Sequence, residues 1–233
     1  MTQQKATTTN LPTSKQGRLV WIDCEMTGLD WDVHTLVEIA VIVTDQELKI
    51  IAEGPDIVIH QTEDVLKKMN EWCRKTFPEN GLLQQIRKSQ ISMEEAEAQI
   101  LSFLEPLVEK GTAPIAGNTV WMDRVFIKKY MPRLDEYLHY RVLDVTAVYQ
   151  ISSLWYPEEH KSVPKKRRLH RALSDIRESI NMLKSLNMNA EYAQTLPRVT
   201  DAKQVDEQRI WPYYCWEIRS SNAYPLVELI FLF

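Results

Sequence analysis

The stretch Leu19–Cys24, LVWIDC, is a nearly continuous apolar run of β-branched and aromatic residues. Such a run is typical of a buried strand. A second run, Leu36–Thr44 (LVEIAVIVT), follows the turn-rich loop MTGLDWDVHT. A third strand is predicted in two pieces, Leu48–Ala52 and Ile57–His60, with an interruption at Gly54-Pro55. Three strands at this close spacing predict an antiparallel meander.

The middle of the chain alternates helices with short strands. One helix is predicted from Thr62, a potential N-cap, through Cys73, and a second from Ser92, with Glu95 in the capping-box position. The later elements are a strand at Pro114–Ala116, a helix at Met122–Tyr130, a strand at Arg141–Val145 and helices at Tyr149–Trp155 and Leu169–Leu186. This order predicts an α/β fold in which helices flank a mixed sheet of five strands.

The two ends of the chain differ from the middle. Residues 1–17 are polar and have no apolar core, so a disordered tail is predicted there and a secretion signal is not. Residues 18–187 carry the strand and helix patterns and are predicted to form one domain. Residues 188–233 lack periodicity and are predicted to be a C-terminal extension, which could be a docked appendage, a partner-binding tail or sequence that does not fold.

The composition limits the classes of function. Apolar residues make up 44% of the 233 residues, so a core can form without disulfides. A net charge of −4 disfavours wrapping of long duplex DNA but is compatible with a short nucleic acid bound through metal ions. Cys24, Cys73 and Cys215 have no CxxC spacing, which favours a reducing compartment, the cytoplasm or the mitochondrion. No run approaches the roughly 18 apolar residues of a membrane span.

Acidic residues form a candidate metal site. Asp23 and Glu25 alternate along the first strand, so their side chains lie on one face and repel each other. Asp123 opens a helix just after a strand, and His170 and Asp175 follow at H-x4-D spacing on the last predicted helix. Each residue alone is weak support, but together they suit hard cations such as Mg²⁺ or Mn²⁺.

Several longer motifs resemble the oligoribonuclease family of the DEDDh 3′→5′ exonuclease superfamily. They occur in the family's order over residues 18–187: WIDCEMTGLD (21–30), EIAVIVTD (38–45), AEGPDIVIHQ (52–61), AGNTVWMDRVFIKKYMP (116–132), HYRVLDV (139–145) and HRALSDIRES (170–179). The resemblance implies an RNase H-like fold, a homodimer, and hydrolysis of very short single-stranded RNA from its 3′ end to 5′-mononucleotides.

The resemblance also implies roles for the acids and the histidine. Asp23, Glu25, Asp123 and Asp175 become the ligands of two Mg²⁺ or Mn²⁺ ions, and His170 becomes the general base. Asp23 and Asp175 are expected to hold the ion that activates the attacking water. The tyrosine subclass of the superfamily is excluded because residue 171 is Arg rather than part of a Y-x3-D motif.

Further residues are expected to bind the substrate. Leu29 matches the family's wedge between the two terminal bases. Thr119 and Thr146 stand where the family has Ser and retain a hydroxyl. The resemblance implies that Tyr140 completes the site from the partner subunit and that Arg141 helps to bind the substrate's 5′ phosphate.

Phe77 departs from the family pattern, because it stands where a His usually stacks on a substrate base. Stacking by its aromatic ring is expected to survive. Two alternatives stay open for the whole chain: a DNA-directed DEDDh exonuclease, and a degenerate nucleic-acid-binding module without catalysis. A requirement for the 2′-OH discriminates against the first, and the intact set of acids argues against the second.

Overall fold

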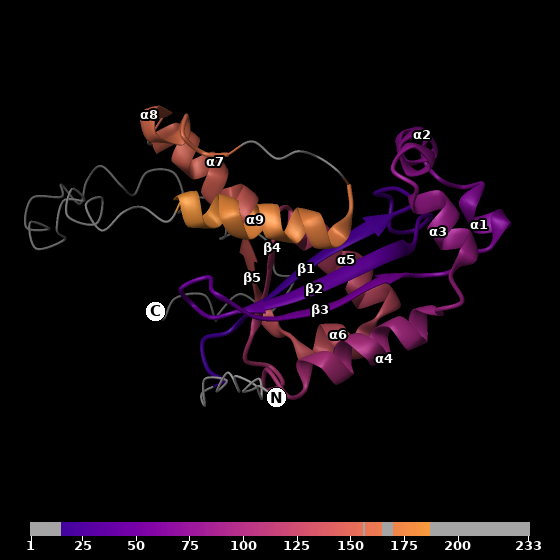
Figure 1. Cartoon of the computed structure of the whole chain (residues 1–233), viewed down its shortest axis with the longest axis horizontal. Coiled ribbons are helices and arrows are strands. Elements are labelled where there is room, and N and C mark those ends of the chain that lie inside the picture. Colours follow the sequence, from indigo (N-terminus) through magenta and orange to yellow (C-terminus); the bar gives the residue numbers. More distant parts are fainter. Residues whose placement is uncertain (1–14, 156, 165–169, 187–233) are drawn as a thin grey trace, which may run out of the picture. The chain divides into compact units, whose positions relative to one another are not determined.

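The centre of the fold is a five-stranded sheet with the strand order β3-β2-β1-β4-β5 (Figure 1). The computed structural model describes residues 15–155, 157–164 and 170–186. The strands are β1 (Leu19–Met26), β2 (Leu36–Thr44), β3 (Ile50–Val58), β4 (Pro114–Gly117) and β5 (His139–Asp144). The first three strands pair antiparallel, whereas β4 and β5 add in parallel. The predicted mixed five-stranded sheet is thus confirmed.

The predicted interruption of the third strand is wrong. Strand β3 runs unbroken through Gly54 and Pro55, and the cost is a register shift opposite Ala40 and Ile42 of β2. Because β3 is an edge strand, a proline there can face away from the ladder and removes no essential hydrogen bond.

Helices cover both faces of the sheet (Figure 1). The helices before β4 are α1 (Glu63–Leu66), α2 (Glu71–Glu79), α3 (Leu82–Lys88) and α4 (Met93–Leu104). Those after it are α5 (Val120–Tyr130), α6 (Pro132–Tyr137), α7 (Val145–Trp155), α8 (Pro157–His160) and α9 (Ala172–Leu186). Within the described ranges, none of these helices is long and apolar enough to cross a membrane.

Strand β1 divides its side chains between two cores. Val20, Ile22 and Cys24 are buried in the cluster formed with α4, α5 and α6. Trp21 is buried in the opposite cluster, which α9 covers. Successive side chains of a strand point to opposite faces, so Asp23 and Glu25 share the face of Trp21 and lie beneath α9.

The helix predicted from Thr62 to Cys73 is two helices in the structure. Thr62 makes no side-chain cap, and α1 ends after one turn. The chain then restarts at Asn70, whose Oδ1 accepts a hydrogen bond from the Cys73 amide at 2.7 Å. Helix α3 follows α2 and was absent from the prediction. These three short helices surround a separate apolar cluster at one end of the sheet.

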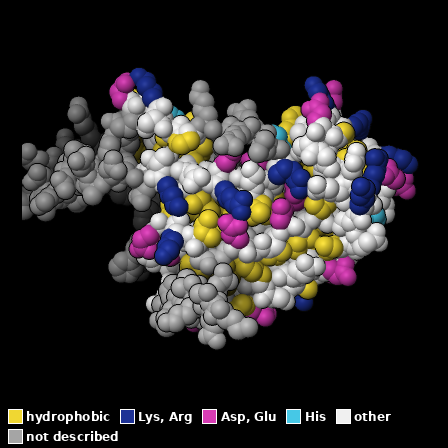
Figure 2. All heavy atoms as spheres, in the orientation of Figure 1, with side chains coloured by type: hydrophobic (Ala, Val, Ile, Leu, Met, Phe, Trp, Pro, Cys, Tyr) yellow, Lys and Arg dark blue, Asp and Glu magenta, His cyan; other side chains and the backbone are white. Residues whose placement is uncertain are grey.

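Charges of both signs are interspersed over the face in Figure 2. Lys and Arg side chains lie beside Asp and Glu rather than forming one broad basic surface on the described residues of this face. The mixture of charges on this face agrees with the small net charge of −4.

The parts of the chain that the prediction assigned to its ends are mostly outside the described residues. This holds for residues 1–14 of the predicted tail and for the whole predicted extension, 188–233. The last residues of the tail are described, and there the Lys15 ammonium donates a hydrogen bond to the carbonyl of Glu105 at 3.0 Å.

The two predicted helix caps provide a test of the fold. In the confirmed capping box, Ser92 Oγ accepts from the Glu95 amide at 3.2 Å, and Glu95 Oε2 accepts from the Ser92 amide at 2.8 Å. We expect Ser92→Ala to lower the free energy of unfolding by about 1 kcal/mol, because an amide of α4 loses its partner. The exposed Thr62 makes no such bond, so Thr62→Ala should cost less than about 0.5 kcal/mol. Equal losses in urea unfolding would contradict the assigned caps.

Candidate active site

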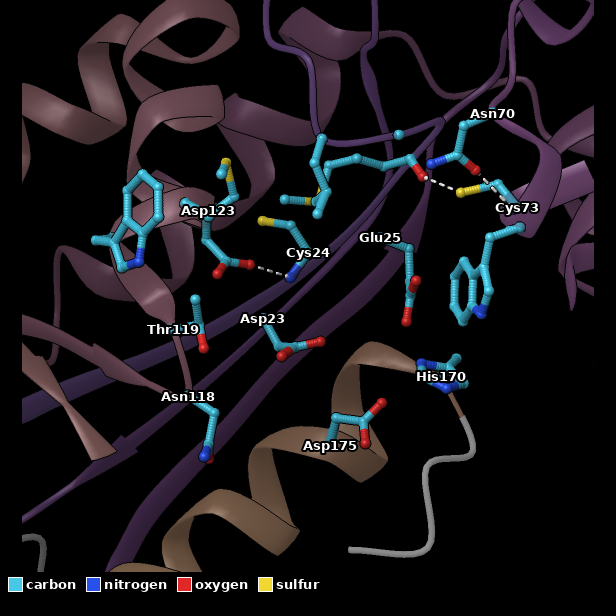
Figure 3. A pocket seen from close by; sticks show the side chains of 16 residues that line it. Asp23, Cys24, Glu25, Asn70, Cys73, Asn118, Thr119, Asp123, His170 and Asp175 are labelled. Carbon is cyan, nitrogen blue, oxygen red and sulfur yellow. Dashed lines mark hydrogen bonds between the residues drawn. The ribbon is translucent and has the colours of Figure 1, made fainter. Parts of the chain in front are cut away.

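A cleft above the end of β1 gathers the predicted acids and the histidine (Figure 3). Asp23 and Glu25 enter it from β1, Asp123 from the first turn of α5, and Asp175 from the first turn of α9. His170 reaches the same cleft from the segment just before α9. Three parts of the chain that are far apart in the sequence therefore place their polar groups in one cavity.

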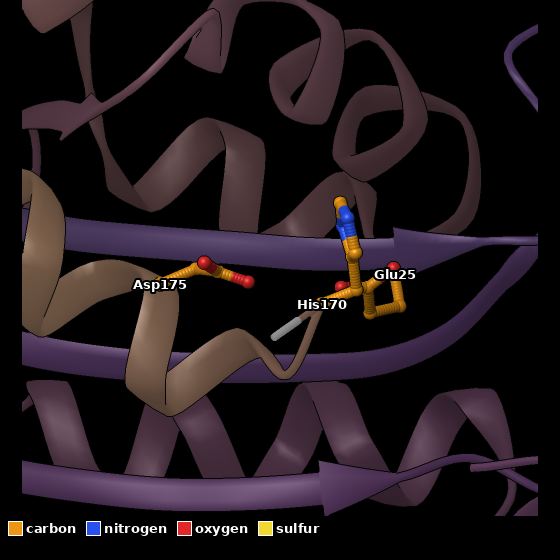
Figure 4. A group of neighbouring side chains, drawn as sticks. All are labelled: Glu25, His170 and Asp175. Carbon is orange, nitrogen blue, oxygen red and sulfur yellow. The ribbon is translucent and has the colours of Figure 1, made fainter. Parts of the chain in front are cut away.

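Three of these residues form a tight group. One oxygen of Glu25, one oxygen of Asp175 and one ring nitrogen of His170 all lie within 4.8 Å of one another (Figure 4). This spacing and this donor set could hold a metal ion. Asp23 and Asp123 line the same cleft without belonging to that tight group. Oxygen donors from carboxylates are the ligands that Mg²⁺ and Mn²⁺ prefer.

The sequence predicts that His170 lies on the last helix, but in the structure it lies just before that helix. It precedes Ala172, the first residue of α9, and has a left-handed backbone with φ of 51°. Asp175 accepts a hydrogen bond from the Arg171 amide at 3.1 Å through Oδ2, which ties the turn to the first turn of the helix. The H-x4-D spacing brings both side chains together through this turn, and not through a helix face.

Asp123 is held in place by the neighbouring strand. Its Oδ1 accepts a hydrogen bond from the Cys24 amide at 2.8 Å, and its carboxyl is buried. Cys24, which lies between the two acids of β1, is itself buried in the core. Helix α5 is thus fixed against the strand that carries Asp23 and Glu25.

Burial raises the pKa values of two acids in the cleft. The pKa of Glu25 is raised to about 8, first by burial and then by repulsion from Glu38, Asp175 and Asp123. Burial also raises the pKa of Asp123, although the Cys24 amide opposes the shift. Without a cation the cleft therefore keeps protons on some of its carboxyls at neutral pH. A divalent cation would displace those protons.

Three of the predicted substrate residues lie in the cleft or directly behind it. Leu29 is 60% exposed and lines the cleft, and Thr119 lines it as well. Thr146 is set one step behind, with its hydroxyl 3.1 Å from that of Thr119. Both threonine amides donate to Asp144 Oδ1 at 2.9 Å, so the two hydroxyls are fixed as a pair.

The prediction that Phe77 stacks on a base is wrong for this structure. Its ring is fully buried in the apolar cluster of α1–α3 and has no exposed face. Trp72, which is half-exposed, lines the cleft, and its ring meets that of His170 edge-on at 4.7 Å between centroids. Trp121 also lines the cleft and is half-exposed. Sequence reasoning missed both indoles as cleft residues, although Trp121 lies within the motif AGNTVWMDRVFIKKYMP.

Tyr140 and Arg141 do not line this chain's cleft. Pro114 pairs with His139 and Ile115 with Val142, so the two residues between them bulge from the edge strand β5. The Arg124 guanidinium holds the bulge by donating to the carbonyls of residues 139, 140 and 141 at 2.7, 3.0 and 3.4 Å. Tyr140 is consequently 73% exposed, and its hydroxyl accepts a hydrogen bond from Arg141 Nε at 3.2 Å.

Comparisons with known proteins identify the family of the chain. Residues 20–183 match the exonuclease family RNase_T. The chain is 54% identical over 168 residues to a probable oligoribonuclease of Caenorhabditis elegans, covering 72% of this chain and 86% of that protein. This chain belongs to the oligoribonuclease family. Another member, the oligoribonuclease of Vibrio vulnificus (strain CMCP6), is 51% identical over 166 residues, which are 71% of this chain and 91% of that one.

Solved structures with low sequence identity share the fold of this oligoribonuclease-family chain. Exonuclease I of Methylocaldum szegediense superposes with a TM-score of 0.53 at 19% identity, over 72% of this chain and 40% of that one. An exonuclease I of E. coli bound to a DNA oligonucleotide gives a TM-score of 0.54 at 16% identity, over 76% and 42%. The match spans less than half of these longer chains and confirms the predicted RNase H-like fold.

The raised pKa of Glu25 predicts how the metal-free protein responds to pH. The unfolded chain loses this proton near pH 4.5, whereas the folded chain keeps it to about pH 8. Between these values the unfolded state binds fewer protons, so the free energy of unfolding falls as pH rises. We expect the melting temperature in EDTA to fall from pH 5 to pH 8.5 more steeply for wild type than for Glu25→Gln. Parallel slopes would contradict the assignment.

Proposed function

We propose that the chain is a 3′→5′ exoribonuclease that hydrolyses very short RNA, including dinucleotides, to 5′-mononucleotides. The observation that carries the proposal is the convergence of Glu25, His170 and Asp175 within 4.8 Å, in a cleft that also holds Asp23 and Asp123. Relatives of about half-identical sequence bear the name oligoribonuclease, which supports the choice of short RNA as substrate.

Two divalent cations, Mg²⁺ or Mn²⁺, are the proposed cofactors. Asp23 and Asp175 would hold one of them, while Glu25 and Asp123 are available for the rest of the cluster. Their donors are all carboxylate oxygens, and the raised pKa of Glu25 reflects a charge that the protein alone does not balance. Such a pair of cations lowers the pKa of a bound water and neutralises charge on the attacking and leaving oxygens.

His170 is the proposed general base. Its ring nitrogen lies within 4.8 Å of both Glu25 and Asp175 oxygens, so it can accept a proton from a water that Asp175 helps to place. Histidine is the side chain that most often serves as a general base in enzymes. Such a positioned base contributes about 10²–10⁴-fold to a rate.

The remaining residues of the cleft are proposed to hold the terminal nucleotides. Leu29 is exposed on a loop at the end of β1 and can separate two adjacent bases. The Thr119 hydroxyl, oriented by Thr146 and Asp144, can donate to a phosphate oxygen. The exposed face of Trp72 replaces Phe77 as the stacking surface in this proposal, because stacking on an aromatic ring tolerates any base.

Hydrolysis of defined RNA lengths tests the function. We expect metal-dependent release of 5′-mononucleotides, fastest from dinucleotides to pentanucleotides and slower for decanucleotides. Asp23→Ala should lower kcat at least about 10³-fold, because a cation worth several kcal/mol loses its ligand. Asp32→Ala, an exposed acid in the following loop, should leave kcat unchanged.

Several outcomes would overturn this function. Turnover that persists in EDTA, or in Asp23→Ala, would contradict the metal-dependent mechanism. Faster processing of long strands would remove the preference for short RNA. Equal turnover of matched DNA oligonucleotides would favour a DNA-directed exonuclease of the same superfamily, and tight binding without any turnover would favour a degenerate binding module.

A homodimer is proposed as the working assembly, with Tyr140 and Arg141 acting in the partner's cleft. Strand β5 is an edge strand, and Tyr140 on its bulge is exposed and does not line the chain's own cleft. Exposed apolar side chains continue from this strand onto α7: Val142, Val148, Ile151, Leu154 and Trp155. Exposed apolar side chains that recur on one strand and one helix are typical of a protein interface, and a second copy would bury them.

Mixing two inactive variants tests whether Tyr140 acts across the interface. A subunit with Asp23→Ala lacks a working metal site but supplies Tyr140, whereas Tyr140→Ala has the reverse defect. A mixed dimer of the two should regain one complete site, which gives roughly a quarter of wild-type activity after random exchange. No recovery on mixing, or full activity of Tyr140→Ala alone, would contradict the shared site.

The cytoplasm or the mitochondrion is the proposed location, because both keep thiols reduced. Cys24 and Cys73 are free and buried, and burial raises the pKa of Cys73 to about 12. Neither thiol is suited to disulfide exchange. The third cysteine, Cys215, lies outside the described residues.

A further inference from the structure

A buried acid lies directly beside the metal-binding face of β1. Glu38 of β2 pairs with Glu25 of β1 in the antiparallel register, so their side chains share one face of the sheet. Glu38 is fully buried, and none of the roles assigned so far uses it. A carboxylate without solvent needs a partner of opposite charge, since its burial is otherwise costly.

Arg171 is that partner. Its Nε and Nη2 donate to Glu38 Oε1 at 3.0 and 2.8 Å, and Nη2 also donates to Gln85 Oε1 at 2.9 Å. The Ala172 amide, the first of α9, reaches Glu38 Oε2 at 3.5 Å. A planar guanidinium held by two acceptors leaves little freedom for the backbone from which it extends.

His170 immediately precedes Arg171, and its backbone conformation has to be stabilised by its surroundings. Its φ of 51° places a non-glycine residue in the left-handed region, a conformation that persists only where the surroundings impose it. Asn80 contributes by donating its Nδ2 hydrogen bond to the His170 carbonyl at 3.0 Å, and the Trp72 ring contacts the imidazole edge-on. The turn is therefore held at its carbonyl, at its ring and at the next side chain.

We propose that the Glu38–Arg171 ion pair is a positioning device for the general base, which fixes the strained turn that aims His170 at Glu25 and Asp175. The proposal rests on the proposed function of His170. The same pairing satisfies Glu38, the acid nearest to Glu25 across the strands, and so keeps its oxygens from competing for the metal. Neither residue touches the substrate in this account.

Conservative variants test the pair without emptying the site. Glu38→Gln keeps the shape and removes the charge, and Arg171→Lys keeps the charge but loses the fork. Each should lower kcat for a dinucleotide about 10–100-fold, the effect of a misplaced catalytic group, and leave KM within about twofold. The matched control is the buried Glu97 with Arg133, which pair at 2.8 Å between α4 and α6 on the opposite face. Glu97→Gln and Arg133→Lys should leave kcat unchanged.

A double-mutant cycle separates positioning from a general structural effect. In a His170→Ala background, Arg171→Lys should reduce the remaining metal-dependent activity by less than about twofold, because the group that it positions is absent. An equal reduction in both backgrounds would overturn the proposal and assign the effect to Asp175 or to the fold. Unchanged kcat in Glu38→Gln and Arg171→Lys would also overturn it.

A crystal structure of Arg171→Lys gives a readout that does not depend on activity. We expect the His170 backbone to leave the left-handed region and the ring to move away from Glu25 and Asp175. An unmoved His170 overturns the positioning role even where kcat has fallen. Failure of the underlying function has a different signature, since His170→Ala would then leave the turnover of short RNA unchanged.

Discussion

Repulsion among carboxylates in one cleft is the constraint on which the rest of the structure depends. Three elements that are widely separated in the sequence supply the four carboxylates, Asp23, Glu25, Asp123 and Asp175. Burial raises the free-energy cost of their negative charges, as the raised pKa of Glu25 indicates. The packing of two apolar cores opposes this repulsion, because it holds β1 between α5 and α9. Cations then complete a site that the protein alone leaves electrostatically unbalanced.

Each element around this cleft has a distinct structural role. Strand β1 presents acids on one face and core residues on the other, and the Cys24 amide links it to Asp123 on α5. The edge strand β5 carries a bulge that leaves Tyr140 exposed. Between them, α9 begins with a turn that places His170, and the buried Glu38 lies beneath that turn. Catalytic geometry is thus built from backbone turns at the ends of regular elements.

Much of this was predictable from residues with simple local rules. Alternation along β1 placed Asp23 and Glu25 on one face, and the Ser92 box located α4. Other features depend on tertiary context that no local pattern reports. The turn at His170 needs Arg171 to find Glu38, which is 133 positions away in the sequence. Phe77 looked like a stacking residue because its position matches a family pattern, but the packing of α1–α3 buries it.

We propose that the carboxylates of this cleft hold two divalent cations. Anomalous diffraction at the manganese edge, from crystals grown with Mn²⁺ and a non-hydrolysable dinucleotide, tests it most directly. The account predicts two peaks roughly 3.5–4 Å apart, with Asp23, Glu25, Asp123 and Asp175 as ligands and His170 facing a water on one ion. Well-ordered dinucleotide in the cleft with no manganese among these acids would contradict it.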